Sequence, residues 1–113
     1  MQIFAVSALI LFLASGAQTN AGPPVEVLVQ GAASEGMLYQ FAKNCGATEA
    51  ALKKFEAANR ADIADMKAKN RGVDFDAVYA KGKTAGAKRF TDLGPGAKTS
   101  EACSSAIALI AQM

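Results

Sequence analysis

The sequence contains no histidine, and its only cysteines are Cys45 and Cys103. The absence of histidine removes the commonest general base, metal ligand and member of a catalytic triad. The two cysteines are too far apart for a Cys-x-x-Cys redox motif. Without histidine, the attachment sequence of a c-type haem is also missing, and a zinc site is close to excluded. We therefore expect a protein with no metal and no cofactor that is not an enzyme.

No charged side chain precedes Glu26, although the chain has 12 Lys and Arg and 10 Asp and Glu. Within this uncharged part, the apolar run of residues 3–13 has the length of a signal peptide and is too short to span a bilayer comfortably. Small residues follow it. Residues 1–21 are therefore predicted to be a signal peptide that is cleaved after Ala17 or Ala21. The mature protein is expected to be secreted or periplasmic, without a membrane span.

The segment that follows the predicted leader, residues 22–32, is expected to be an extended arm. Gly22-Pro23-Pro24 is stiff, and Val25–Gln30 alternates like a strand for which the chain offers no partner. An early turn of the first helix is the alternative.

Residues 33–113 have the apolar periodicity of amphipathic helices. The pattern predicts an all-α fold, a small four-helix bundle with helices near residues 33–45, 48–69, 74–92 and 100–112. Each helix is preceded by residues suited to cap its amino terminus: Ser34, Thr48, Asp74, and Thr99 or Ser100. Short connections make sequential neighbours roughly antiparallel.

A disulfide between Cys45 and Cys103 is predicted from the helix faces. The first helix places five side chains on one apolar face and turns Tyr39 away from it; the five are Met37, Leu38, Phe41, Ala42 and Cys45. Cys103 lies on the apolar face of the last helix. A single pair of cysteines in an exported chain indicates a structural cross-link. Closing a loop of nearly sixty residues contributes about 4 kcal/mol in the chain-entropy model.

Two glycines, Gly82 and Gly86, lie in the middle of the apolar face of the third predicted helix. Glycine costs about 1 kcal/mol relative to alanine inside a helix, so this pair indicates that another helix approaches closely. Tight internal packing is the favoured interpretation, and a groove for a ligand or peptide is the alternative.

A candidate partner surface consists of one amide and five basic residues: Asn59, Lys67, Lys69, Arg71, Lys81 and Lys88. A net charge of +2 is too small to indicate nucleic-acid binding, so another protein is the expected partner. Each residue also has a structural interpretation. Asn59 falls inside an apolar face, where a buried amide must find a hydrogen-bond partner. The basic side chains suit an ordinary solvated helix surface.

Two pairs of carboxylates are the only candidates for catalysis: Asp62 with Asp65, and Asp74 with Asp76. The first pair lies among surface charges of a helix, and the second occupies a helix amino terminus, where the dipole stabilises negative charge. Both pairs therefore have structural explanations.

The layout of a leader, a mature helical part near ninety residues and one long-range disulfide resembles in outline the HdeA-type periplasmic acid chaperones. The resemblance implies no functional residue. We expect an exported, non-enzymatic binding protein that acts through a helical surface, such as a chaperone, an inhibitor or an immunity-type protein. The alternatives are a small secreted enzyme that uses carboxylates and a purely structural envelope protein. The chaperone version predicts opening at pH 2–3, where protonated carboxylates leave the chain near +12.

Overall fold

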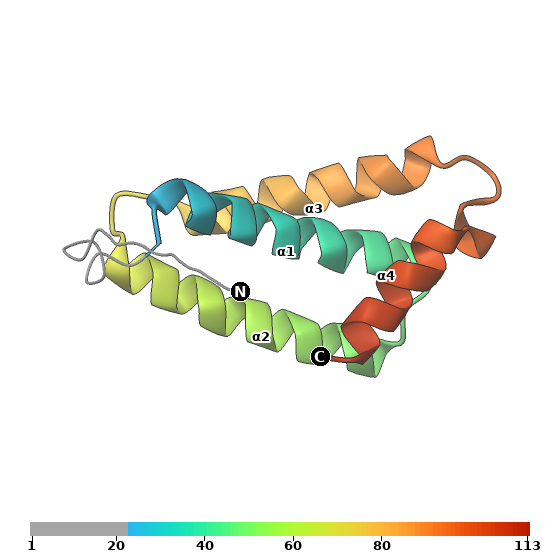
Figure 1. Ribbon diagram of the computed structural model, residues 1–113, viewed down its shortest axis with the longest axis horizontal. Helices are drawn as coiled ribbons and strands as arrows, with labels where there is room; N and C mark the ends of the chain where they lie inside the picture. Colours follow the sequence, from blue (N-terminus) through green and yellow to red (C-terminus); the bar gives the residue numbers. More distant parts are fainter. Residues whose placement is uncertain (1–22) are drawn as a thin grey trace, which may run out of the picture.

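The computed structural model describes residues 23–113, and these residues form four α-helices and no β-strand. The helices are α1 (Val25–Cys45), α2 (Glu49–Lys69), α3 (Phe75–Asp92) and α4 (Glu101–Ala111), with a short 3-10 turn, η3 (Ala97–Thr99), before α4 (Figure 1). This arrangement confirms the predicted all-α bundle. None of the described helices has the length and apolar character needed to cross a membrane. The predicted signal peptide, residues 1–21, lies outside the described residues.

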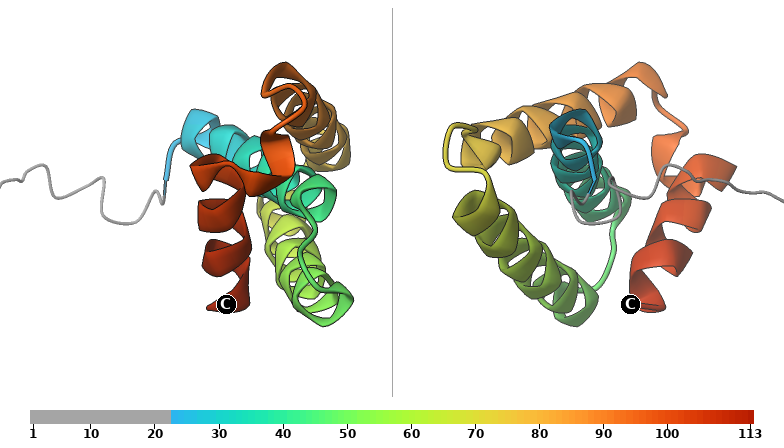
Figure 2. Two further views of the ribbon diagram at one scale, coloured as in Figure 1. Left: turned by 90° about the vertical axis from the view of Figure 1, so that its right-hand side faces the viewer. Right: turned by 60° about the vertical axis from the view of Figure 1, so that its left-hand side comes forward.

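The most closely packed helices, α1 and α3, run side by side in the same direction, because α2, which separates them in the sequence, returns the chain along the molecule (Figures 1 and 2). The pairs α1–α2 and α2–α3 run in opposite directions, as expected from their short connections, but α4 does not run antiparallel to α3. The second helix diverges from the α1–α3 pair. The short α4 crosses the end of the molecule at which α1 finishes and α2 begins.

Three glycines allow α1 and α3 to touch through their backbones. A Cβ on Gly82 would overlap the carbonyl group of Ala33, and a Cβ on Gly86 would overlap the backbone of α1 one turn later. From the other side, a Cβ on Gly36 would overlap the carbonyl oxygen of Tyr79. The packing interpretation of Gly82 and Gly86 is therefore confirmed. Gly36 is their counterpart on α1, and its role was not predicted.

The core has two parts, one toward each end of α1. At the disulfide end, the buried residues are Tyr39, Phe41, Ala42, Cys45, Leu52, Phe55, Cys103, Ala106 and Ile110. At the other end, the buried residues are Ala32, Ile63, Phe75 and Tyr79. Every helix contributes to at least one part, so burial of apolar surface holds the four helices together.

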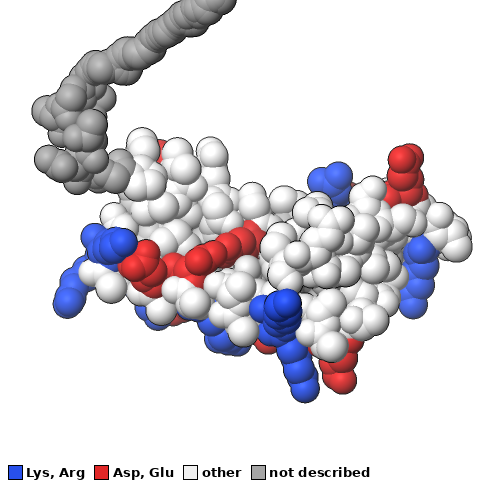
Figure 3. Space-filling view, turned by 60° about the horizontal axis from the view of Figure 1, so that its bottom comes forward, with Lys and Arg blue, Asp and Glu red and all other residues white. Residues whose placement is uncertain are grey.

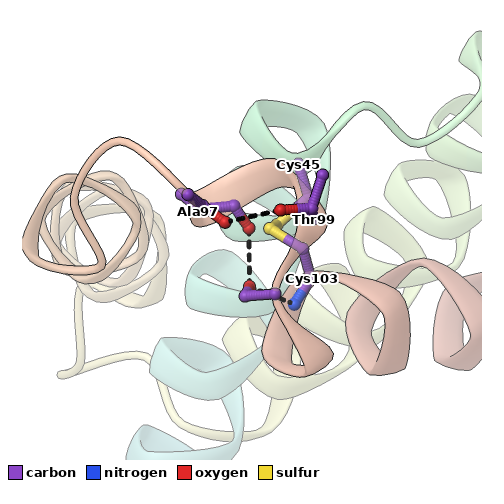
Figure 4. The surroundings of a disulfide bond; sticks show 6 residues. Cys45, Ala97, Thr99 and Cys103 are labelled. Atoms are coloured by element: carbon purple, nitrogen blue, oxygen red, sulfur yellow. Dashed lines mark hydrogen bonds between the residues drawn. A yellow bond between two sulfur atoms is a disulfide. The ribbon is translucent and has the colours of Figure 1, made fainter.

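The disulfide between Cys45 and Cys103 joins the last residue of α1 to the first turn of α4, with 5.3 Å between the two Cα atoms (Figure 4). The predicted cross-link is thereby confirmed. Ser100 fixes the start of α4, because its Oγ accepts a hydrogen bond from the amide of Cys103 and donates one to the carbonyl of Ala97. The orientation of α4 relative to α1 is thus set by a covalent bond and a capped turn.

The predicted caps of three helices are confirmed. Thr48, Asp74 and Ser100 each accept a hydrogen bond from a backbone amide three residues later. Gly46 ends α1 in the left-handed conformation with a φ of 104°, which glycine adopts without steric cost.

The extended arm predicted for residues 22–32 is wrong from Val25 onward, because α1 begins there and Ser34 lies inside it. The alternative, an early turn of the first helix, gives the correct helical structure but includes too few residues. Leu28, Val29 and Ala32 pack against the part of the core that contains Phe75. This tertiary contact outweighs the weak helix preference of the β-branched residues.

Tyr39 does not point away from the core as predicted but is 9% exposed. The Nζ of Lys83, on α3, lies 5.1 Å from the centre of the Tyr39 ring and 5.5 Å from that of Tyr79. Because α3 approaches α1 so closely, it covers a second face of α1 that the periodicity alone assigns to solvent.

Candidate functional site

The structure places Asn59 in the interior, which corrects its assignment to a partner surface. The residue is 1% exposed, and its Nδ2 donates a hydrogen bond of 3.0 Å to the hydroxyl of Tyr79. Burial raises the pKa of Tyr79, so this phenol remains neutral at physiological pH. Asn59 therefore joins α2 to α3, as the structural interpretation requires.

The five basic candidates do not gather into one positively charged surface. Three of them form ion pairs with neighbouring carboxylates in the described structure: Lys67 with Asp76, Lys69 with Asp65, and Lys88 with Asp92. Arg71 and Lys81 are exposed. Such pairs reduce the local positive potential and contribute little to stability. Charge alone therefore does not mark a binding face here.

An apolar groove of about 280 Å³ lies between α1 and α4. From α1 it is lined by Ser34, Met37, Leu38 and Phe41, and from α4 by Ala102, Ser105, Ala106 and Leu109. Both sets follow the i, i+3, i+4, i+7 spacing of one helix face. Leu109 is 48% exposed at this groove. The groove thus presents a contiguous apolar surface to solvent on a rigid, cross-linked part of the fold.

Among the described residues, Arg89 is the one charged residue that lines the groove. It extends from α3, and its guanidinium carbon lies 5.7 Å from the centre of the Phe41 ring. This distance is within the range of a cation–π contact. Among the ion pairs of the described residues, none involves Arg89. A positioned cation therefore stands beside the apolar lining.

An acidic notch formed by Glu35, Asp62 and Asp65 lies between α1 and α2. On one face, acidic side chains form a short band beside a broad uncharged area (Figure 3). The Oε1 atom of Glu35 is buried and has no hydrogen-bond partner in the part of the chain that the structure describes. The carboxyl of Asp62 lies within hydrogen-bonding reach of Glu35. Negative charge on two carboxyl groups this close is unfavourable, which favours the protonated form of Glu35.

Desolvation, together with the hydrogen bond and the negative charge of Asp62, raises the pKa of Glu35 to about 8. The ordinary value for glutamate, which applies to the unfolded chain, is 4.5. Between these values the folded chain holds a proton that the unfolded chain releases. The Glu35–Asp62 contact therefore stabilises the fold fully below about pH 4.5, and this stabilisation is lost as the pH rises through about 8.

We expect the free energy of unfolding to fall by about 1–2 kcal/mol between pH 5 and pH 9 through Glu35 alone. This figure is well below the full value of the pKa shift, because Glu35 is only half-buried and solvent screens it. Urea unfolding at the two pH values measures the difference. The variant Glu35→Gln should lose this pH dependence, because its amide carries no titrating proton.

The variant Glu26→Gln is the matched control, since Glu26 lies on the same helix and is exposed. It should retain the pH dependence of the parent protein. An equal pH dependence in the parent and in Glu35→Gln would show that Glu35 does not hold the proton.

The groove and Glu35 were not predicted from the sequence, although each has a signal there. Leu109 lies at the margin of the apolar face of α4, where an unfilled neighbouring surface would leave it exposed. Glu35 stands between Ala33 and Gly36, so a carboxylate is placed among small residues that allow another helix to approach. A single acidic residue within a stretch of small residues therefore indicates a position that a neighbouring helix can bury.

Comparison of the chain with protein-family models, with curated protein sequences and with solved structures gives no match. The function therefore has to be inferred from the residues of this structure.

Proposed function

We propose that the domain is a non-enzymatic binding protein that holds the apolar part of a ligand in the α1–α4 groove. The observation that carries the proposal is the groove itself, an apolar concavity that remains accessible to solvent. Accessible apolar concavities with few polar groups are the common form of ligand sites. The backbone contact of α1 with α3 and the disulfide to α4 hold its walls in place before any ligand binds.

The acidic notch is the one feature that favours the alternative of a small enzyme. Glu35, whose pKa is raised, stands beside a second carboxyl group, that of Asp62, and such a pair resembles an acid–base pair in its chemistry. However, the side chains from residues 23–113 that line the notch include no cation and no hydroxyl that would bind a substrate. The pair also has a structural role at the α1–α2 interface. We therefore assign binding, not catalysis, to the domain.

The titration of Glu35 works against opening of the contact between α1 and α2 as the pH falls from about 8 to about 4.5. As the pH falls from about 8 toward 4.5, Glu35 takes up its proton and the contact between α1 and α2 becomes stronger. A chaperone triggered at pH 2–3 would have to open through its other carboxylates, because the contribution of Glu35 no longer changes below about pH 4.5. Binding in a preformed groove requires no such opening.

Export to an oxidising compartment is part of the proposal. The Cys45–Cys103 disulfide and the apolar run of residues 3–13 both support it. The domain would then act outside the cytosol, either in a periplasm or in the extracellular space.

The uncharged dye Nile red tests the groove at neutral pH. We expect saturable binding of one dye per protein, with a rise in fluorescence. Replacing Leu109 by glutamate should weaken binding by roughly tenfold, because a charge replaces a large apolar side chain of the lining. Leu109 is half-exposed, so the fold should tolerate this change.

The variant Leu93→Glu is the matched control. Leu93 is 39% exposed at the end of α3 and lies outside the groove, so this variant should bind the dye as the parent does. Two results would contradict the proposal: no dye binding at neutral pH, or equal weakening by the two variants.

A further inference from the structure

We propose that the natural ligand of the groove is a small single-chain amphiphile with a carboxylate head group, which pairs with Arg89. This inference rests on the proposed function and names the class of ligand. It combines two observations, the apolar lining of the groove and the single cation placed beside it.

The dimensions of the groove favour a small molecule over a protein partner. Its walls span eight residues of each helix, which corresponds to about 10 Å along a helix axis. A stable protein–protein interface usually buries about 800 Å² on each side and involves roughly 20–30 residues per partner. The volume of about 280 Å³ equals that of about nine water molecules at ~30 Å³ each, the scale of a medium-length hydrocarbon chain.

The charge at the groove favours an anionic head group. The neighbouring cation Lys88 is already paired with Asp92 at 2.9 Å, whereas no described carboxylate pairs with Arg89. The Phe41 ring holds the guanidinium beside the apolar lining. A guanidinium in this position can bind both oxygens of a carboxylate through two parallel hydrogen bonds.

A carboxylate head group fits Arg89 better than a neutral polar head group, because Arg89 has no carboxylate partner among the described residues. A hydroxyl offers one acceptor atom and no charge, so it satisfies the guanidinium poorly. A second cation would be repelled. The ligand that satisfies both the apolar wall and Arg89 therefore carries one negative charge at one end of an uncharged chain.

The test compares three amphiphiles that share a ten-carbon chain: decanoate, 1-decanol and decyltrimethylammonium. Displacement of Nile red at neutral pH, below the concentration at which micelles form, gives their affinities. We expect decanoate to bind roughly five- to tenfold more tightly than decanol, because a charge-assisted hydrogen bond is stronger than a neutral one. The cationic amphiphile should bind most weakly.

The variant Arg89→Gln should bring decanoate to the affinity of decanol and leave decanol unchanged. Arg89→Lys should recover part of the preference, since it keeps the charge but loses the two-pronged geometry. Lys88→Gln is the matched control, because Lys88 is adjacent in sequence and already paired; it should behave as the parent protein. Circular dichroism checks that each variant is folded.

Two results would overturn the inference while leaving the proposed function in place. The first is equal affinity for decanoate and decanol in the parent protein, which would remove the role of Arg89. The second is failure of every amphiphile to displace bound Nile red, which would indicate a larger partner. Failure of Nile red itself to bind would instead contradict the proposed function.

Discussion

Replacing Cys45 and Cys103 together by serine is expected to lower the melting temperature by about 15–30 °C. The disulfide closes a loop with a sequence separation of 58, and such a cross-link contributes about 4 kcal/mol. In a domain of this size, each 1 kcal/mol corresponds to about 4–8 °C. Thermal unfolding followed by circular dichroism measures the loss.

A second variant with alanine at both positions separates the cross-link from the polarity of serine. Cys103 is 0% exposed and Cys45 is 5% exposed, so buried hydroxyls would add their own cost. The alanine pair and the chemically reduced parent protein should both lose most of the same stability. A loss below about 5 °C in both cases would show that the helices pack without help from the bond.

Replacing Gly82 by alanine is expected to destabilise the fold by about 2–3 kcal/mol. Alanine at an ordinary helix position stabilises by about 0.5–1 kcal/mol relative to glycine. At Gly82 the added Cβ would overlap the carbonyl group of Ala33, and backbone atoms cannot rotate out of the way as a side chain can. The two helices would have to separate, with loss of contacts along their length. Urea unfolding at neutral pH gives the change in free energy.

The matched control is Gly31→Ala on α1. A Cβ at Gly31 meets no atom within 4 Å, so this substitution should raise stability by about 0.5–1 kcal/mol. The same chemical change therefore has opposite signs at two helical glycines. If Gly82→Ala also stabilised the protein, the close backbone contact between α1 and α3 would be excluded.

The parts of the fold that local sequence determines were predicted well. Thr48, Asp74 and Ser100 cap the helices as expected, because a side-chain oxygen satisfies backbone amides without help from distant residues. The disulfide was also predictable, since two cysteines on apolar helix faces have few other partners.

The errors arose where a distant segment decides the local structure. The helical structure of α1 before Ser34 depends on distant residues such as Phe75, because Leu28 and Val29 pack against the part of the core that contains Phe75. Tyr39 is buried because Gly36 lets α3 approach α1 on a face that periodicity assigns to solvent. Neither effect can be derived from helical propensity, because both depend on which helices pair.

The candidate site could not be predicted from the sequence, for a related reason. The groove exists where α1 and α4 fail to close over each other, so it depends on the angle set by the disulfide and the capped turn at Ser100. The sequence pattern favoured basic residues as the partner surface, yet three of the five basic candidates are paired with carboxylates. The cation that matters in our proposal, Arg89, was identified only by its place beside Phe41.

The central claim is that the α1–α4 groove binds the apolar part of a ligand, and an NMR titration of the backbone amides tests it most directly. The probe is Nile red, which carries no charge and so tests the groove independently of Arg89. Our account predicts saturable shift changes confined to residues 34–41 of α1, 102–109 of α4 and their immediate neighbours. Changes centred on Asp62 and Asp65 of α2, in the acidic notch, or no saturable change at any residue, would contradict it.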